Sequence, residues 1–173
     1  PGVPGRDLGR LDPGKRNFSI ACPRAVPAWD YPVYSRMQKK SLGIIRETKV
    51  PPDKRVPLTP VQCRSLLDRY PGLELLVQPS DNRCYTDGEY RAEGIPLSED
   101  LSSCDILLGV KEVKVQTFLD GLTYLLFSHT AKKQPYNRGL LQEVIRRGIS
   151  LVDYEYLTDA EGIRVVAFGR WAG

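Results

Sequence analysis

The sequence lacks the features that mark several common classes of protein. No apolar run approaches the roughly 18 residues that a membrane-spanning helix needs, and no signal-peptide core is recognisable. No GxGxxG motif follows an apolar run, so the fingerprint of a dinucleotide-binding turn is missing. The cysteines form no CxxC pair and no histidines cluster near them, which argues against a zinc site and favours free thiols in a reducing compartment. They are Cys22, Cys63, Cys84 and Cys104. We therefore predict no metal, no membrane partner and a cytoplasmic location.

Methionine is also scarce, because Met37 is the only one, and the residues before it differ in composition from the rest. Residues 1–36 hold six of the 14 prolines and four of the 15 glycines and show no apolar periodicity, which is typical of disordered chain. They also carry a net charge of +3 out of the chain's +4, so the pI of about 8.9 does not indicate a nucleic-acid-binding surface. We predict that residues 1–36 are a disordered extension or an upstream translated segment, with a transit peptide as the alternative. Residues 37–173 are predicted to form one folded domain.

Within that domain, short apolar runs alternate with segments that carry helix signals. Thr59 followed by Pro60 is typical of a helix start, and Thr86 with Glu89 matches a capping box. Strands are predicted at residues 42–46, 73–77, 105–110, 123–127 and 150–154. Helices are predicted from Pro60 to about Tyr70, in a short segment ended by Gly94, and over 135–147, where Leu140, Leu141, Val144 and Ile145 would face inward. The alternation predicts an α/β fold with a doubly wound, mostly parallel sheet of the Rossmann-like or flavodoxin-like kind.

The stretch from residue 107 to 132 is the most informative about function. Two apolar runs, 106–110 and 124–127, each end there on polar, titratable residues. Because neighbouring parallel strands present their carboxyl ends to one crevice, we expect Lys111 and His129 to meet in it. An amine and an imidazole suit proton transfer, and His129 is the only histidine in the chain. The alternative is that Lys111 is an ordinary solvated residue at a strand end and that His129 has no chemical role.

Six motifs, in a fixed order, extend this pattern over the whole domain. They are IIRETK at 44–49, RVPLTP at 55–60, ILLGVKE at 106–112, FSHTAK at 127–132, DYE at 153–155 and GIRVVAFGRWAG at 162–173. In this order they resemble the N-terminal domain of the saccharopine dehydrogenase and lysine–ketoglutarate reductase family, which is related to the N-terminal domains of alanine dehydrogenase and transhydrogenase. The similarity runs from about Leu42 to Gly173. The FSHxxK, DYE and RVVAFGxWAG motifs favour the saccharopine branch.

The resemblance implies an acid/base pair and a set of substrate-binding residues. The lysine after the LG-strand and the histidine of the FxH motif correspond to Lys111 and His129, the implied catalytic residues. Substrate contacts are implied for Lys49, Arg55, Glu112, Lys132, Glu155 and Arg164. Arg164 would clamp a substrate carboxylate, and the alternative is a simple surface ion pair between Glu155 and Arg164.

The resemblance also implies an activity. It indicates the substrate-binding and acid/base half of an oxidoreductase that interconverts saccharopine with lysine and 2-oxoglutarate. The cofactor would be NAD or NADP, bound mainly by a C-terminal nucleotide-binding domain that this sequence lacks. The partner would then be a small molecule, without nucleic acid or membrane. Two alternatives stay open: an alanine dehydrogenase-like enzyme acting on a smaller amino acid, and a non-catalytic regulatory or oligomerising domain.

Overall fold

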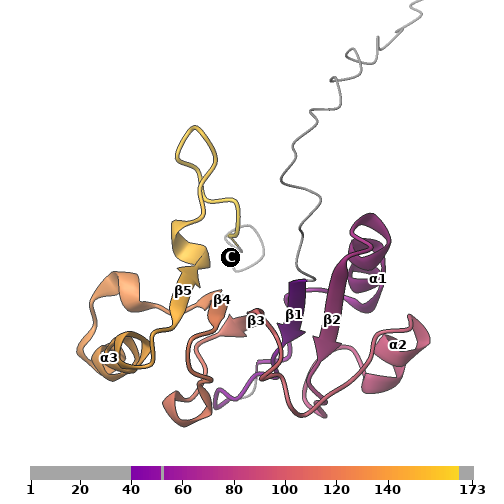
Figure 1. Ribbon diagram of the computed structural model, residues 1–173. Helices are drawn as coiled ribbons and strands as arrows, with labels where there is room; N and C mark the ends of the chain where they lie inside the picture. Colours follow the sequence, from indigo (N-terminus) through magenta and orange to yellow (C-terminus); the bar gives the residue numbers. More distant parts are fainter. Residues whose placement is uncertain (1–39, 52, 168–173) are drawn as a thin grey trace, which may run out of the picture. The chain divides into compact units, whose positions relative to one another are not determined.

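The computed structural model describes residues 40–51 and 53–167 (Figure 1). The predicted extension, residues 1–36, lies outside the described residues, as does the end of the last motif. Five strands form one sheet in which every pairing is parallel. The strands are β1 (Lys40–Ile44), β2 (Leu73–Val77), β3 (Ile106–Lys111), β4 (Thr123–Phe127) and β5 (Ser150–Asp153). The helices are α1 (Pro60–Arg69), α2 (Asp87–Ala92) and α3 (Arg138–Arg146), with 3-10 turns η2 (Val115–Thr117), η3 (Thr130–Lys132), η4 (Pro135–Asn137) and η5 (Tyr154–Tyr156).

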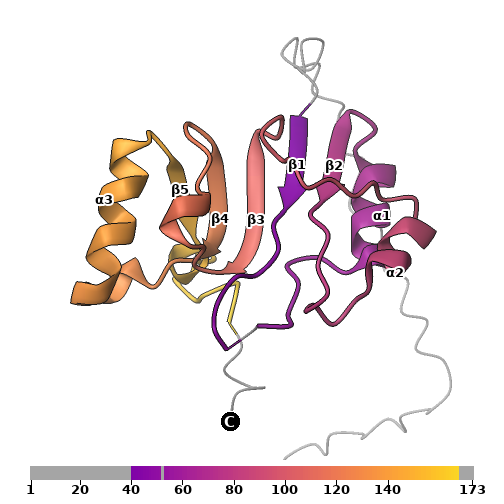
Figure 2. The same cartoon turned by 90° about the horizontal axis from the view of Figure 1, so that it is seen from below.

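The strand order is β2-β1-β3-β4-β5, which can be followed across the sheet in Figure 2. The chain runs from β1 to β2 on one side and then returns past β1 to continue with β3, β4 and β5. This is the flavodoxin-like order, in which the direction of winding reverses between β1 and β3. The predicted α/β fold with a doubly wound parallel sheet is confirmed.

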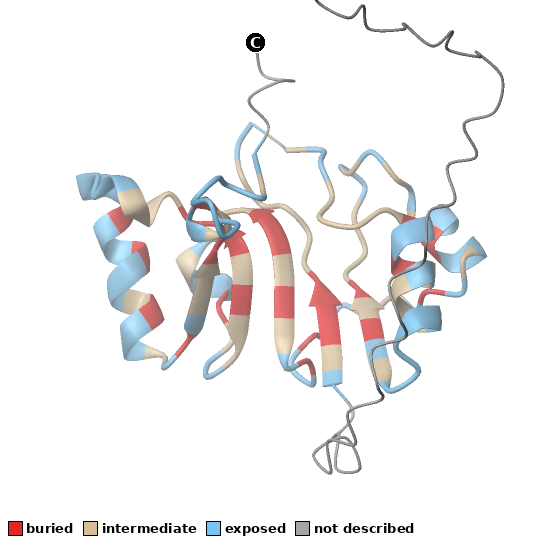
Figure 3. Ribbon diagram, turned by 90° about the horizontal axis from the view of Figure 1, so that it is seen from above, coloured by how far each residue is buried: buried red, intermediate tan, exposed pale blue. Residues whose placement is uncertain are grey.

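An apolar cluster lies on each face of the sheet, because alternate residues of a strand point to opposite faces. Figure 3 colours most of the length of the strands as buried or intermediate. Leu107 of β3 belongs to one cluster, whereas its neighbours Ile106 and Leu108 pack against the other. The first cluster includes Leu140 and Val144 of α3. The second includes residues of α1 and α2 together with inward residues of β1 and β2; these are Cys63, Tyr90, Leu42, Ile44, Leu75 and Val77. Helices therefore cover both faces, and the carboxyl edge of the sheet is left to the loops.

The helix starts agree with the sequence signals. The Thr59 side chain accepts a hydrogen bond from the backbone N–H of Gln62, and the Gln62 side chain accepts one from the backbone N–H of Thr59. Thr86 and Glu89 form the same reciprocal box at the start of α2. Each box satisfies two backbone N–H groups that the first helical turn leaves without partners. Both predicted caps are confirmed.

The prediction for α3 is partly wrong. The helix begins only at Arg138, after the 3-10 turn η4, and of its four apolar residues only Leu140 and Val144 are buried. Leu141 is 43% exposed and Ile145 is 73% exposed. Positions 140 and 144 lie four apart and share a face, whereas their successors are rotated by about 100° around the helix. The face of α3 that is buried is therefore narrower than the apolar face that the sequence predicted.

The first strand also ends two residues earlier than predicted. The backbone N–H of Ile45 still bonds to the carbonyl of Leu108, but that of Arg46 donates to the side chain of Gln78 at 3.1 Å. The chain then leaves the sheet and carries residues 47–49 over the end of β3. None of the helices within residues 40–51 and 53–167 is long and apolar enough to cross a membrane.

Candidate active site

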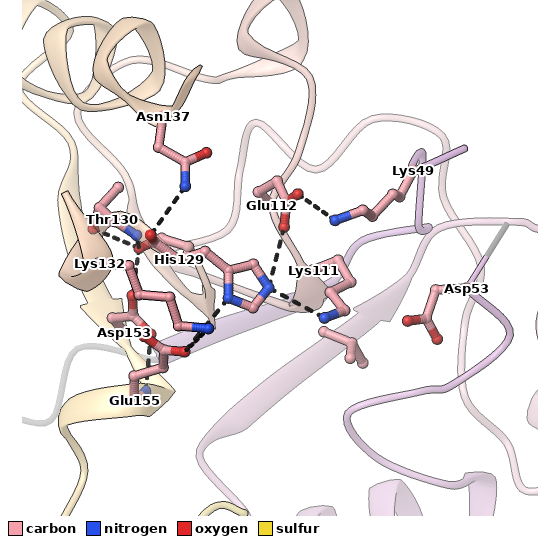
Figure 4. Close-up of polar contacts among 12 residues, drawn as sticks. Lys49, Asp53, Lys111, Glu112, His129, Thr130, Lys132, Asn137, Asp153 and Glu155 are labelled. Atoms are coloured by element: carbon pink, nitrogen blue, oxygen red, sulfur yellow. Dashed lines mark hydrogen bonds and ion pairs between the residues drawn. The ribbon is translucent and has the colours of Figure 1, made fainter. Parts of the chain in front are cut away.

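Polar side chains from four strand ends gather at the carboxyl edge of the sheet (Figure 4). Lys49 lies in the loop after β1, Lys111 is the last residue of β3, and Glu112 follows it. His129 follows β4, and Glu155 lies in η5 directly after β5. In open parallel sheets this edge is where ligands bind, above all where the winding reverses. The structure therefore assembles six of the eight predicted site residues at one place, because Lys132 of η3 also lies beside Glu155.

Lys111 and His129 are in direct contact. The Nζ atom of Lys111 lies 3.1 Å from Nε2 of His129, and both side chains are partly buried. An ammonium group has only donors, so in this contact Nε2 accepts when Lys111 is charged. A proton can pass along this line in either direction. The two residues thus have the geometry that a shared acid/base pair requires.

The imidazole of His129 lies between two carboxylates. Its Nε2 is 3.7 Å from Oε2 of Glu112, and its Nδ1 is 3.4 Å from Oε1 of Glu155. Each carboxylate also meets a lysine, with Lys49 Nζ 2.5 Å from Oε1 of Glu112 and Lys132 Nζ 3.9 Å from Oε1 of Glu155. The result is a row in which basic and acidic groups alternate, with the imidazole at its centre. Close opposite charges of this kind are how proteins hold charged groups away from water.

Several buried polar atoms in this row have no hydrogen-bond partner among the described residues. They are Oε2 of Glu112, Nδ1 of His129 and Oε2 of Glu155, together with Oγ1 of Thr48 in the loop after β1. The great majority of buried polar atoms in proteins are hydrogen-bonded, so such a concentration calls for an explanation. Two acceptors and a ring nitrogen at one place suit a polar ligand that carries an amine or hydroxyl group.

The backbone at His129 adopts the left-handed conformation, with φ 56° and ψ 13°. This conformation costs a non-glycine residue about 1–3 kcal/mol and persists only where surrounding contacts enforce it. Here the side chain of Asn137 donates to the His129 carbonyl at 3.0 Å, and the N–H of Thr130 donates to Oγ of Ser128 at 3.2 Å. The conformation turns the ring toward Lys111 instead of letting the chain continue straight out of β4.

Glu47 is a residue of this site that the sequence reasoning missed. Its carboxylate accepts the backbone N–H of Val110 at 2.6 Å and that of Lys111 at 3.0 Å, at the register shift of β3. Burial raises the pKa of Glu47, although the two N–H groups oppose that effect. The loop approaches closely because position 109 is glycine: a Cβ there would lie 2.8 Å from Cδ1 of Ile45. The only sign of Glu47 in the sequence was its place in the RETK motif, two residues before Lys49.

The structure places Arg55 in a pair of its own. Its guanidinium bonds to Asp53, with Nε 2.9 Å from Oδ1. The hydrogen bond from Arg55 lowers the pKa of Asp53 from 3.8 to about 2, and the charge of Lys111 adds to the effect. Arg55 is therefore held near the edge of the site (Figure 4 includes Asp53 beyond Lys111), and its predicted role in substrate binding stays a prediction.

The pair of Asp53 and Arg55 gives a dependence on pH. The pKa of Asp53 is about 2 in the folded protein, against an ordinary value of 3.8. The pair therefore stabilises the fold fully when the pH is above 3.8, and this contribution is lost as the pH falls through 2. We expect Arg55→Met to bring the pKa of Asp53 back toward 3.8, measured by carboxyl-carbon NMR titration. Arg64→Met, which removes the partner of Asp68 on α1, is the control. An unchanged Asp53 titration in Arg55→Met would contradict the assignment.

Arg164 lies apart from the row. It is exposed and forms an isolated antiparallel bridge with Thr158 in the hairpin that follows η5, drawn in yellow in Figure 1. The alternative of a surface ion pair between Arg164 and Glu155 is not what the structure contains, because the Glu155 side chain is only 6% exposed and faces His129 and Lys132. The carboxylate-clamping role of Arg164 stays a prediction.

This arrangement of fold and strand ends has relatives. A family model described as alanine dehydrogenase/PNT, N-terminal domain, matches residues 43–173. The chain belongs to this family. One relative is the alpha-aminoadipic semialdehyde synthase of Bos taurus, named as mitochondrial. It is 41% identical over 135 residues, which is 78% of this chain and 14% of that protein. Saccharopine dehydrogenase [NAD(+), L-lysine-forming] of Emericella nidulans is 35% identical over 143 residues, which is 79% of this chain and 37% of that protein.

Solved structures of the alanine dehydrogenase/PNT kind share the fold. An L-alanine dehydrogenase superposes with a TM-score of 0.59 at 18% identity, covering 70% of this chain and 34% of the other. The transhydrogenase from Sinorhizobium meliloti gives 0.54 at 15% identity, covering 66% and 35%. This chain spans well under half the length of the relatives it matches. The resemblance found in the sequence, to the saccharopine dehydrogenase and lysine–ketoglutarate reductase group of this superfamily, is confirmed.

Proposed function

We propose that this domain is the substrate-binding and acid/base half of a saccharopine dehydrogenase-type oxidoreductase, which interconverts saccharopine with lysine and 2-oxoglutarate. The observation that carries the proposal is the contact between Lys111 and His129, flanked by Glu112 and Glu155. Relatives named as saccharopine dehydrogenase and alpha-aminoadipic semialdehyde synthase support the choice of reaction. A cytoplasmic location, inferred from the scattered cysteines, is part of the same proposal.

The proposed reaction requires these residues to accept protons from the substrate and from water and to return protons to the leaving amine. In the direction that forms lysine, the carbon that bears the secondary amine loses hydride, and the amine must first be free of its extra proton. Lys111, which contacts His129, takes that proton. Water then adds to the resulting imine carbon, and His129 accepts the proton that water loses. The pair then returns a proton to the carbinolamine nitrogen and takes the hydroxyl proton as the carbon–nitrogen bond breaks and the ketone forms. The freed lysine amine takes up a second proton, and the one proton left over passes to water, which returns the pair to its starting state.

The charges suit the proposed substrate. Saccharopine carries three carboxylates and two amines, and the row offers cations at Lys49 and Lys132 and acids at Glu112 and Glu155. Arg55 and Arg164 would add two planar cations for carboxylates. An alanine dehydrogenase-like enzyme, the alternative, needs to hold only one carboxylate and one amine, so fewer of these residues would contact its substrate.

The described strand ends do not fit the pyrophosphate of a dinucleotide. The loops that follow the five strands begin RETK, QPS, EVK, SHT and YEY, without the glycines that let a backbone approach phosphate. We therefore propose that NAD or NADP is held mainly by a nucleotide-binding domain. That cofactor, when bound, supplies the acceptor for hydride, while the residues of this chain bind the substrate and move its protons.

Ligand binding to the 173-residue protein tests the proposal. Because His129 is the only histidine, its imidazole gives a single set of NMR signals that report directly on the site. We expect saccharopine to shift these signals at lower concentration than lysine or 2-oxoglutarate alone, and L-alanine to shift them least. Val61→Ala, a change at an exposed residue of α1, is the control and should bind each of the four compounds as the unchanged protein does.

Other outcomes of that titration select the alternatives. A response to L-alanine that equals or exceeds the response to saccharopine would favour the alanine dehydrogenase-like enzyme. No response to any of the four would favour a non-catalytic domain. We also expect the 173-residue protein to transfer no hydride to NAD or NADP by itself, and turnover above the buffer rate would contradict the assignment of the cofactor to another domain.

A further inference from the structure

Asp153, the last residue of β5, is buried and uses both of its carboxylate oxygens. Its Oδ2 accepts a hydrogen bond from the hydroxyl of Ser128, which is fully buried at the end of β4. Its Oδ1 accepts the backbone N–H of Glu155 at 2.8 Å. The Asp153 carboxylate thus links Ser128, the residue before His129, to the backbone of Glu155. His129 and Glu155 are the two residues that the contact between Nδ1 and Oε1 joins.

The Ser128 hydroxyl extends this connection into the strained segment. Its oxygen accepts the N–H of Thr130 at 3.2 Å and lies 2.7 Å from the Thr130 hydroxyl. His129, with its left-handed backbone, therefore lies between Ser128 and Thr130, and Thr130 bonds to the hydroxyl oxygen of Ser128. Because a hydroxyl can donate one bond and accept others, Ser128 can serve Asp153 and Thr130 at the same time.

We propose that Asp153 is a positioning residue, which acts through Ser128 to hold His129 in its left-handed conformation at a fixed distance from Glu155. The inference rests on the proposed function for its kinetic part only. Neither Asp153 nor Ser128 belongs to the row of charged groups at the carboxyl edge of the sheet, and neither needs to touch substrate. Their effect would be to keep the imidazole in line with Lys111, where a displacement of about 1 Å can cost on the order of 10²-fold in rate.

Three variants separate geometry from charge. Asp153→Ala removes both connections, Ser128→Ala removes only the one to His129, and Asp153→Asn keeps an oxygen for the Glu155 N–H and an amide group able to bond to the Ser128 hydroxyl. In the enzyme that contains this domain, we expect Asp153→Ala and Ser128→Ala to lower kcat by about 10–100-fold with little change in KM. Asp153→Asn should recover most of the loss. The double variant Asp153→Ala, Ser128→Ala should be little worse than either single one, because both break the same link.

The opposite end of the sheet offers a matched control. There the Ser41 hydroxyl bonds to Oδ2 of Asp105 at 3.1 Å, which likewise joins two neighbouring strands. Asp105→Ala and Ser41→Ala should lower kcat far less than the variants at Ser128 and Asp153. An equal loss of kcat in the control pair would show a general effect of weakening the sheet and would overturn the proposal.

A structural readout keeps the inference separate from the proposed function. In the 173-residue protein, crystal structures or NMR couplings of Ser128→Ala should show φ of His129 leaving 56° and Nδ1 moving beyond 3.4 Å from Glu155. If that happens and the enzyme does not act on saccharopine, the positioning role stands and the proposed function fails. If His129 keeps its place in both Ser128→Ala and Asp153→Ala, or if Asp153→Asn is as slow as Asp153→Ala, the proposal is wrong.

Discussion

Replacing Lys111 by methionine or His129 by glutamine is expected to lower kcat by about 10²–10⁴-fold in the enzyme that contains this domain, with a smaller effect on substrate binding. Each change removes one end of the 3.1 Å contact along which the proton would move, while leaving a side chain of similar size. The loss should fall on kcat because proton transfer is needed in the transition state and adds little to ground-state binding. Steady-state kinetics over pH 6–9 with saccharopine and with lysine plus 2-oxoglutarate measure it.

Lys114→Met is the matched control, because Lys114 is exposed and lies just after the site in the loop that follows β3. It should retain near-native kcat. The double variant Lys111→Met, His129→Gln should lose less than the product of the two single losses, since both residues serve one proton path. Near-native turnover in both single variants would refute their role as the acid/base pair, and Lys111 would then be an ordinary residue at a strand end.

Tyr90→Ala is expected to lower the free energy of unfolding by about 3–5 kcal/mol, as is usual when a large aromatic residue is removed from a core. The Tyr90 side chain is fully buried, its hydroxyl donates to the carbonyl of Leu58 at 2.7 Å, and the guanidinium of Arg83 lies 4.4 Å from its ring centre. A domain of this size has about 5–15 kcal/mol in total, so the variant would sit near the limit of stability. Urea unfolding of the 173-residue protein measures the change.

Two further variants divide the effect of Tyr90. Tyr90→Phe keeps the ring and loses only the hydroxyl, so it should cost about 1 kcal/mol, the usual net value of one hydrogen bond. Tyr136→Ala removes a tyrosine that is 71% exposed and should change stability little. Equal costs for Tyr90→Ala and Tyr136→Ala would contradict the assignment of Tyr90 to the core.

The elements that sequence reasoning located best are those specified by local chemistry. The ranges of β2 and β4 were predicted to the residue. The helix start at Thr59 and the capping box at Thr86 were found because each signal lies within a few consecutive residues. The meeting of Lys111 and His129 was predicted because parallel strands in the same sheet end at one edge. In each of these cases the deciding pattern lies within a few residues or follows from a general rule of sheets.

The parts that were missed depend on which strands become neighbours. Glu47 bonds to the end of β3 only because β1 lies beside β3, and no local pattern states that order. Asp153 bonds to Ser128 only because β5 lies beside β4. Leu141 and Ile145 were predicted inward because apolar periodicity gives the direction of a helix face but not the width of the surface that covers it.

The position of β1 between β2 and β3 has a consequence for when the site is completed during folding. The contacts that complete the site join residues far apart in the chain: Lys49 and Glu112 are 63 positions apart, and Glu47 and Lys111 are 64 apart. Such pairings must first overcome the entropy of closing a long loop, and folds built from them form slowly. A nascent chain that has made β1, α1 and β2 has paired two strands but holds only one side of the site. The complete site should therefore form late and all at once, when β3, β4 and β5 have joined the sheet, and no shorter folding intermediate would carry a weakened form of it.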